Sequence, residues 1–309
     1  MMQTYGYVGL GTIGLPIATR LAALPGAALV VADSSPQALE TLKDLPNVTV
    51  VETPAEVARQ CDVLFACLPN PATGEAVFLG AGGVAEAGAA AEGLIVVDNS
   101  TVSPASAERL SHGLGATGIH YFECPVLGGV AQAVSGELFG VVSGPEVEYT
   151  STVAALLPVF TRDHRYVGAT TGTASRMKTI QNGLGLVQWA GIVEALGIIT
   201  KGGADVGLWY DVVINGGGMA GTGLFEAQAL KILSGDLSFV AFLRIGAKDI
   251  ALACEQARKM GLDASVFEAA NRTFERAIEM GLGDSEMATL ARVIEDKFGT
   301  TLVGAAPRL

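Results

Sequence analysis

The sequence predicts an α/β fold in which a doubly wound N-terminal domain is followed by an all-helical C-terminal domain, with a long helix joining the two. Up to residue 168, short apolar runs typical of buried strands alternate with helical periods. Beyond that point the apolar periods are helical, and glycine clusters separate them. Residues 158–168 combine proline with Arg162, Asp163 and Arg165, which is typical of a boundary. We therefore expect two domains, 1–168 and 169–309.

The composition is that of an acidic chain with ample material for a core. Its 309 residues are 50% hydrophobic, with a net charge of −12 and a mean hydropathy of +0.44. This acidity argues against nucleic acid or an anionic membrane as partner. The most apolar stretches include Glu, Gln or Asp within about 18 residues, so no transmembrane helix is predicted.

Cysteine and histidine are sparse and scattered. The four cysteines lack a paired CxxC spacing and the three histidines lie far apart, so we expect neither a metal site nor a disulfide framework. No charged segment precedes the first apolar run, which predicts the absence of a signal peptide. These features predict a reducing, cytoplasmic location.

A glycine loop follows the first predicted strand, residues 5–8, and opens a helix. The loop reads Gly9-Leu10-Gly11-Thr12-Ile13-Gly14. The first glycine permits a tight turn, the second lets the backbone approach a pyrophosphate, and the third lets the helix pack on the strand. This predicts a Rossmann-type dinucleotide site, although a glycine-rich turn without a ligand would share the pattern.

An acidic residue ends the second predicted strand, residues 30–32. Asp33 lies about 20 residues beyond the glycine loop, where a carboxylate accepts a hydrogen bond from a ribose hydroxyl. Ser34, Ser35 and Pro36 follow, so the segment lacks an arginine for a 2′-phosphate. We therefore predict NAD as the cofactor, in preference to NADP.

The α/β alternation continues along the first domain. The predicted helices are 35–45 and 54–59, with a loose helix and loop over 81–93. The predicted strands are 48–51, 63–68, 94–97 and 136–143, and residues 121–129 are predicted as a strand that runs into a glycine turn. Pro69 and the segment Asp98-Asn99-Ser100-Thr101 end two of these strands, and ligands bind at that edge of a parallel sheet. Ser103 before Pro104 predicts a helix N-cap. For Ser100 and Thr101, a capping role alone is the alternative.

The long joining helix, Thr173–Lys201, is apolar over most of its circumference, which is typical of a buried helix. We expect Thr171 and Thr173 to supply its N-cap. Lys178, Gln181 and Asn182 share one narrow polar face. Because burying a lysine is unfavourable unless it is paired or reactive, Lys178 either extends to the surface or points into a polar cavity.

Taken together, these motifs resemble those of the β-hydroxyacid dehydrogenases, the group of 3-hydroxyisobutyrate dehydrogenase and tartronate semialdehyde reductase. The opening resembles the family's GLGxMGxPMAxNL. The later matches, in chain order, are Leu68-Pro69-Asn70 with LPN, Asp98-Asn99-Ser100-Thr101 with DMST, Glu123 to Gly129 with DAPVSGG, Lys178 to Asn182 with KxxNN, and Lys248-Asp249 with the late KD. The resemblance spans essentially the whole chain.

The resemblance implies a role for each matched position. Lys178 would be the general acid/base. The implied substrate-binding residues are Thr101, Leu127, Gly128, Gly129, Asn182 and Asp249. The implied cofactor-binding residues are Gly9, Gly11, Thr12, Ile13, Gly14, Asp33, Leu68, Pro69, Thr101 and Lys248. The resemblance also implies a small hydroxy acid as substrate and a homodimer or homotetramer built on the helical domain.

Some positions depart from the family pattern. Arg20 stands in place of an asparagine, Asn99 of a methionine, Gln181 of the first asparagine of the pair, and Leu127 of a serine that helps to hold the substrate carboxylate. Since Lys178 and Asn182 are retained, the implied chemistry is unaffected. Leu127 predicts a bulkier or more apolar substrate, unless its side chain turns into the core.

The implied reaction requires a base at the substrate hydroxyl, because that proton leaves as the carbonyl forms. Lys178 meets this need if burial and a positive nicotinamide lower its pKa. For Lys248, a surface lysine beside Asp249 is the alternative. Phe239 or Phe242 is a candidate wall of the nicotinamide pocket, with core packing as the alternative. Cys124 is expected to be a buried, unreactive thiol. Two other functions fit the same architecture: an imine reductase, whose members usually lack the lysine, and a non-catalytic dinucleotide-binding module.

Overall fold

The computed structural model describes residues 3–306. It divides into two compact units, Met1–Lys178 and Thr179–Leu309. The long helix α9 (Thr173–Lys201) begins in the first unit and continues in the second.

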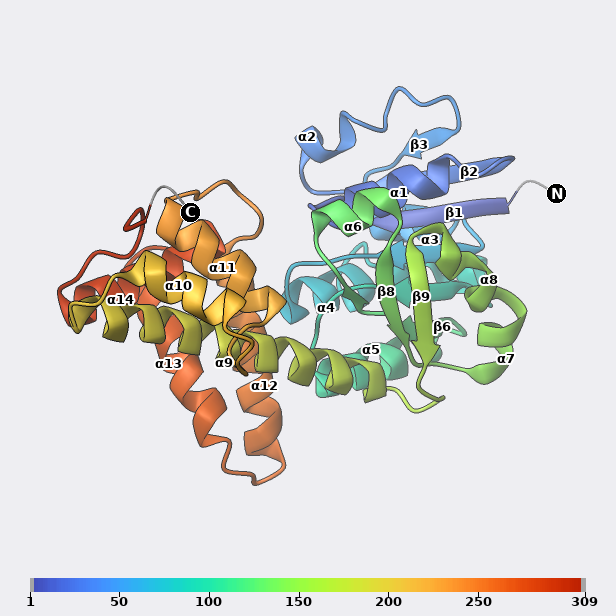
Figure 1. Ribbon diagram of the computed structural model, residues 1–309. Coiled ribbons are helices and arrows are strands. Elements are labelled where there is room, and N and C mark those ends of the chain that lie inside the picture. Colours follow the sequence, from blue (N-terminus) through green and yellow to red (C-terminus); the bar gives the residue numbers. More distant parts are fainter. Residues whose placement is uncertain (1–2, 307–309) are drawn as a thin grey trace. The chain divides into compact units, whose positions relative to one another are not determined.

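The first unit is built on a six-stranded, all-parallel sheet (Figure 1). The strand order is β3-β2-β1-β4-β5-β6, which is the Rossmann order and confirms the predicted fold class. The strands are β1 (Gln3–Val8), β2 (Ala27–Ala32), β3 (Val48–Val50), β4 (Val63–Ala66), β5 (Ile95–Asp98) and β6 (His120–Glu123). The side chains of β4 and β5 are buried throughout, as expected for strands covered on both faces.

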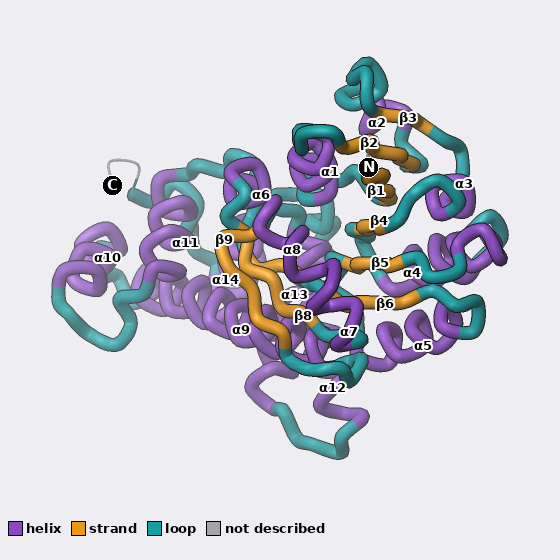
Figure 2. Tube along the Cα trace, turned by 90° about the vertical axis from the view of Figure 1, so that its right-hand side faces the viewer, coloured by secondary structure: helices purple, strands orange, loops and turns teal. Residues whose placement is uncertain are grey.

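Helices cover both faces of this sheet, with α3, α4 and α5 on one side and α1, α6 and α8 on the other (Figure 2). Alternate residues of β1 divide between two cores: Tyr5 and Tyr7 join one and Val8 the other. The helices and helical turns are α1 (Gly14–Ala22), α2 (Pro36–Leu39), α3 (Pro54–Ala58), α4 (Pro71–Leu79), η1 (Val84–Ala91), α5 (Pro104–Gly115), α6 (Val130–Ser135), α7 (Glu146–Glu148), η2 (Tyr149–Val153), α8 (Ala154–Leu156) and η3 (Leu157–Val159). The helix predicted over 35–45 is wrong beyond Leu39, where the chain continues in turns.

A second, three-stranded sheet was not predicted. It has the order β7-β8-β9 and comprises β7 (Val126–Leu127), β8 (Leu138–Val142) and β9 (Thr161–Tyr166). β9 lies where the charges of 158–168 had indicated a domain boundary. Its exposed Arg162, Asp163 and Arg165 instead fit an edge strand, where charge is common.

Arg20, which replaces an asparagine of the family motif, has a structural role in this unit. Its Nε donates to the Val159 carbonyl at 2.5 Å and its Nη1 to the Val134 carbonyl at 3.1 Å. The guanidinium thus joins the last turn of α1 to the end of α6.

Helix α9 has the predicted bounds, but its start is held differently from the prediction. The amides of Gly172 and Ser175 donate to the Glu123 carboxylate and that of Ala174 to the Ser143 hydroxyl, whereas the Thr171 hydroxyl contacts Ser111. Strand residues therefore provide this cap.

The prediction that α9 is buried around nearly its whole circumference is also wrong for the single chain. Its exposed apolar residues are Met177, Ile180, Leu184 and Ile198. The helix is long and apolar enough to satisfy a length-and-composition test for a membrane span, which core helices of soluble proteins also satisfy.

The described elements of the second unit are helical. Besides the rest of α9 they are α10 (Val206–Asn215), α11 (Gly223–Ser234), α12 (Leu243–Lys259), α13 (Ser265–Glu279), η4 (Met287–Leu290) and α14 (Ala291–Phe298). They share one core, to which α9 contributes Val193 and Leu196, both fully buried. Gly183 permits the close packing of α9, because a Cβ there would lie 2.7 Å from the Phe267 ring and 2.8 Å from Ala253.

Candidate active site

The glycine loop has the geometry that its three glycines predict. Gly9 has φ +91°, and a Cβ there would lie 2.5 Å from the Cys67 carbonyl. A Cβ on Gly14 would lie only 2.0 Å from the Gly9 carbonyl, whereas one on Gly11 would meet nothing within 4 Å. Gly9 and Gly14 are therefore required by the fold itself. Gly11 leaves open space beside the loop, which fits a pyrophosphate near the backbone.

Asp33 is tied to the same loop. Its Oδ2 accepts from the Leu10 amide at 2.6 Å and its Oδ1 from the Ser35 amide at 2.7 Å. A carboxylate oxygen accepts more than one hydrogen bond, so this anchoring leaves capacity for a ribose hydroxyl. The glycine loop and Asp33, the residue predicted to bind the ribose, are thus hydrogen-bonded to each other before any ligand binds. The sequence spacing alone did not reveal this link.

A buried polar network joins the loops that follow β4 and β5. The Leu68 amide donates to Ser100 Oγ at 2.8 Å, and the Ser100 amide donates to Asp98 Oδ1 at 2.9 Å. The Tyr121 hydroxyl completes the network by donating to Asp98 Oδ2 at 2.9 Å. Burial raises the pKa of Asp98 and raises that of Tyr121 well above its usual value. Ser100 therefore joins the two loops and caps neither α4 nor α5, whose N-caps are Asn70 and Ser103.

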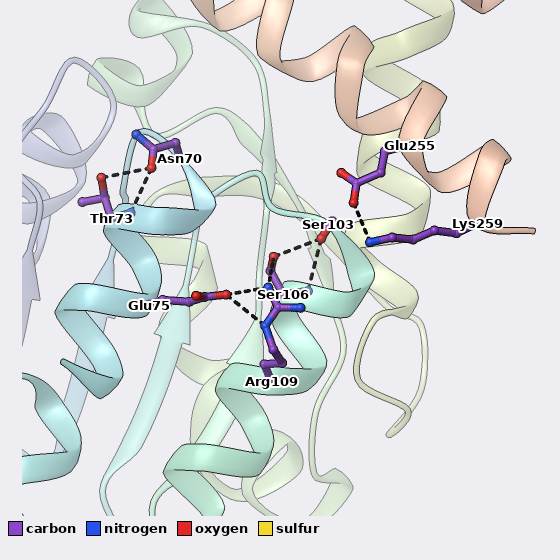
Figure 3. Close-up of polar contacts among 8 residues, drawn as sticks. All are labelled: Asn70, Thr73, Glu75, Ser103, Ser106, Arg109, Glu255 and Lys259. Carbon is purple, nitrogen blue, oxygen red and sulfur yellow. Dashed lines mark hydrogen bonds and ion pairs between the residues drawn. The ribbon is translucent and has the colours of Figure 1, made fainter.

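The helices that start at this edge are capped by side chains (Figure 3). Asn70 accepts from the Thr73 amide at 2.9 Å at the start of α4. Ser103, before Pro104, caps α5 as predicted, since its hydroxyl accepts from the Ser106 amide at 3.2 Å. These caps fix the ends of the two loops, and half-buried Thr101 lies in the second of them.

The turn after β7 contains Gly128 and Gly129, two of the implied substrate-binding residues. Gly128 has φ +123°, which favours glycine, but the Gly129 amide already donates to Gln132 Oε1 at 2.9 Å. A carboxylate at this turn would have to replace Gln132 to use that amide. Leu127 is half-buried, pairs with Phe139 of β8, and belongs to neither described core cluster of this unit.

Lys178 is only 7% exposed, on the second turn of α9. This burial contradicts one of the two alternatives for Lys178, extension of its side chain to the surface. Asn182 follows one helical turn later, on the same face. A buried amine can serve in proton transfer, and an amide on the same helical face is a candidate for orienting it.

Asn182, Lys248 and Asp249 form what we term the α9–α12 polar cluster, within the second unit. Asn182 Nδ2 donates to Asp249 Oδ2 at 2.7 Å, and Lys248 Nζ lies 3.1 Å from Asp249 Oδ1. Because an ionised carboxylate only accepts, this contact directs the NH2 group of Asn182 to Asp249 and leaves its carbonyl oxygen as an acceptor. Lys248, whose side chain is 19% exposed, is mostly buried and paired, unlike a freely solvated surface lysine.

Several neighbouring residues were not identified by sequence reasoning. The Thr179 hydroxyl donates to Gln256 Oε1 at 2.9 Å, and both residues are buried. Farther along α12, Glu255 and Lys259 form an ion pair at 2.5 Å (Figure 3). Helical spacing finds the latter pair, but only the packing of α9 on α12 brings Thr179 to Gln256.

The remaining candidates have simple environments. Cys124 is fully buried, and burial raises its pKa to about 12, which agrees with an unreactive thiol. Phe239 and Phe242, the two candidate walls of the nicotinamide pocket, pack on each other with ring centroids 4.5 Å apart.

Comparison with known proteins identifies two matched segments. Residues 4–168 match the NAD binding domain of 6-phosphogluconate dehydrogenase, and residues 172–294 match the family described as NAD-binding of NADP-dependent 3-hydroxyisobutyrate dehydrogenase. L-threonate dehydrogenase of Cupriavidus necator is 30% identical over 95% of this chain and 96% of its own.

Solved structures show the same relationship. A 3-hydroxyisobutyrate dehydrogenase from Salmonella typhimurium has a TM-score of 0.81 and 26% identity, covering 94% of this chain and 99% of its own. Psf3 in complex with NADP+ has a TM-score of 0.79 and 28% identity, with the same coverage. An imine reductase from Aspergillus terreus, at a TM-score of 0.59 and 22% identity over 94% of this chain and 98% of its own, shares the fold alone. The chain belongs to the β-hydroxyacid dehydrogenase family and uses a nicotinamide dinucleotide cofactor.

Proposed function

We propose that this protein is an NAD-dependent oxidoreductase that interconverts a 3-hydroxy acid, or a β-hydroxy amino acid, with the corresponding semialdehyde or keto acid. The observation that carries the proposal is the burial of Lys178 on α9, one turn before Asn182. The dehydrogenases among its relatives act on hydroxy acids of this class, such as L-threonate and 3-hydroxyisobutyrate.

The proposed role of Lys178 is to hold and move one proton. When bound, the nicotinamide supplies the site that accepts or donates the hydride. In oxidation, the neutral Lys178 amine takes the proton of the substrate hydroxyl; in reduction, the ammonium returns it to the carbonyl oxygen. The neutral amine is the form that accepts a proton.

Asn182 and Asp249 support this chemistry through orientation. The Asp249 carboxylate holds the amide of Asn182, so its carbonyl oxygen is available to the substrate hydroxyl or to the Lys178 ammonium. We assign the carboxylate end of the substrate to Thr101 and to the turn Leu127-Gly128-Gly129. Lys248 and the residues Gly9, Gly11, Thr12, Ile13, Gly14, Asp33, Leu68 and Pro69 are assigned to the cofactor.

The proposed preference for NAD rests on Asp33. Its carboxylate is fixed by the Leu10 and Ser35 amides, so it cannot easily turn away from an added 2′-phosphate. Like charges at that position disfavour NADP.

Lys178→Met tests the function. Its kcat should fall by about two to four orders of magnitude, the usual contribution of a general acid/base, while NAD affinity stays near normal. The assay uses a panel of 3-hydroxy acids and β-hydroxy amino acids with NAD at alkaline pH. Lys201→Met, at the exposed end of the same helix, is the matched control and should retain full kcat.

Two outcomes would overturn the proposal. A Lys178→Met variant with half the wild-type kcat would exclude the acid/base role. Turnover of cyclic imines, without turnover of any hydroxy acid, would identify an imine reductase instead. We also propose a cytoplasmic homodimer or homotetramer associated through the helical unit, where α9 and α10 expose Leu184, Ile198, Leu208 and Val212.

A further inference from the structure

Glu123 and Ser143 form a buried hydrogen-bonded pair at the ends of β6 and β8. Each residue is 1% exposed, and their backbones bond each other in both directions at 3.0 Å. The Ser143 hydroxyl also donates to Glu123 Oε2 at 2.5 Å. The strands therefore fix this pair independently of α9.

The same pair receives the first turn of α9. Glu123 Oε2 accepts from the Gly172 amide at 2.5 Å and Oε1 from the Ser175 amide at 3.0 Å. Ser143 Oγ accepts from the Ala174 amide at 3.3 Å. The start of a helix presents amides without intrahelical partners and favours negative charge. A buried carboxylate with a hydroxyl neighbour meets both requirements.

Lys178 follows Ser175 by three residues, so the two share a face of α9. Lys178 is 7% exposed, so packing limits how far its side chain can compensate for a shift of the main chain. The hydrogen bonds of Glu123 hold that main chain one turn earlier.

We propose that Glu123 is a positioning residue for Lys178, acting through the first turn of α9. The inference rests on the proposed acid/base role of Lys178. A displacement of about 1 Å at a reacting group costs about 100-fold in rate. Loss of the Glu123 contacts should therefore act on kcat, while the glycine loop and Asp33 keep their geometry.

Glu123→Gln is the principal test. Glutamine has one acceptor oxygen and one NH2 group, so one of the α9 amides would face a donor instead of an acceptor. We expect kcat to fall by about 10- to 100-fold, with the Kd for NAD, measured by fluorescence titration, changing less than about 2-fold. In a Lys178→Met background the same substitution should lower kcat by less than about 3-fold, since its effect passes through Lys178.

Two further variants separate positioning from stability. Glu295→Gln is the matched control, because Glu295 Oε1 also accepts from two amides, those of Leu302 and Val303, at 2.6 and 2.8 Å. It should lower the Tm but leave kcat unchanged. Ser143→Ala keeps the carboxylate but removes the hydroxyl that donates to Glu123 and accepts from the Ala174 amide, so it should lower kcat by about 3- to 10-fold even if Glu123→Gln fails to fold.

Three results would overturn the inference. The first is a folded Glu123→Gln enzyme with at least half the wild-type kcat, and the second, should that variant not fold, is an unchanged kcat in Ser143→Ala. The third is an equal fold-loss from Glu123→Gln in the wild-type and Lys178→Met backgrounds, which would show a structural role only. Failure of the proposed function is recognised separately, because the Lys178→Met single variant would then retain its kcat.

Discussion

The glycine loop and the α9–α12 polar cluster both contain an anchored carboxylate, but the anchors differ in kind. Asp33 is held by the backbone amides of Leu10 and Ser35, and all three residues belong to one βαβ unit. Asp249 is held by two side chains, Asn182 from α9 and its own neighbour Lys248. The first arrangement depends on the path of the backbone, and the second on how two helices pack.

This difference explains what could be read from the sequence. Strand, glycine loop, helix and acid are local and have fixed spacing, so the parallel sheet and the dinucleotide site were predictable. The orientation of Asn182 depends on a residue 67 positions away. A family motif indicated that Asp249 matters, but it gave no physical reason.

Glu123 shows the same limit more clearly. It matched a motif position, yet its contacts with Ser143, Gly172 and Ser175 join three segments of the chain. The predicted caps, Thr171 and Thr173, were the local solution to the start of α9. Likewise β9 was missed because its charges resemble those of a linker, and only its pairing with β8 makes it a strand.

The largest expected effect comes from the glycine loop. Gly14→Ala places a Cβ 2.0 Å from the Gly9 carbonyl, so the loop must shift. Overpacking of this kind costs about 1–3 kcal/mol, and we expect a lower Tm together with loss of measurable NAD binding. Calorimetry and NAD titration provide the measurements.

Gly11→Ala, where a Cβ meets nothing within 4 Å, should keep the Tm within about 1 °C while NAD affinity falls at least about 10-fold. Equal Tm values for the two variants would contradict the distinction between them.

The carboxylate of this loop should set the choice of cofactor. We expect kcat/KM to favour NAD over NADP by at least about 10-fold, because Asp33 accepts from the ribose hydroxyl and repels a 2′-phosphate. Steady-state kinetics with both cofactors decide the matter. A ratio near one, or one in favour of NADP, would be incompatible with this role for Asp33.

The α9–α12 polar cluster should respond to loss of charge rather than of volume. Asp249→Asn is nearly isosteric, but the new amide can donate as well as accept. The side-chain amide of Asn182 could then bind it in the reversed orientation, so kcat/KM should fall by about 10-fold, or about 1.4 kcal/mol. The Tm should change little. Asp284→Asn removes an exposed partner of Arg244 and serves as the control. If both substitutions have the same effect on kcat/KM, then the cluster has no special role.

The smallest effect concerns substrate size. Leu127→Ser restores a hydroxyl that can donate to a carboxylate, and such a bond contributes roughly 1.5–3 kcal/mol at most. We expect kcat/KM for the smallest 3-hydroxy acids to rise by about 3- to 10-fold relative to substituted ones. A size series measured on both enzymes gives the ranking. A wild type that already prefers the smallest acids would contradict the proposed specificity, as would an unchanged ranking in the variant.

The charges on β9 have a consequence for how the protein behaves in concentrated solution. An edge strand presents unpaired backbone groups to which a strand of another molecule can add. Arg162, Asp163 and Arg165 are exposed on this edge, and a second chain in register would have to bring their charges together. These three residues therefore protect the small sheet against edge-to-edge aggregation, and surface engineering of this enzyme should leave them in place.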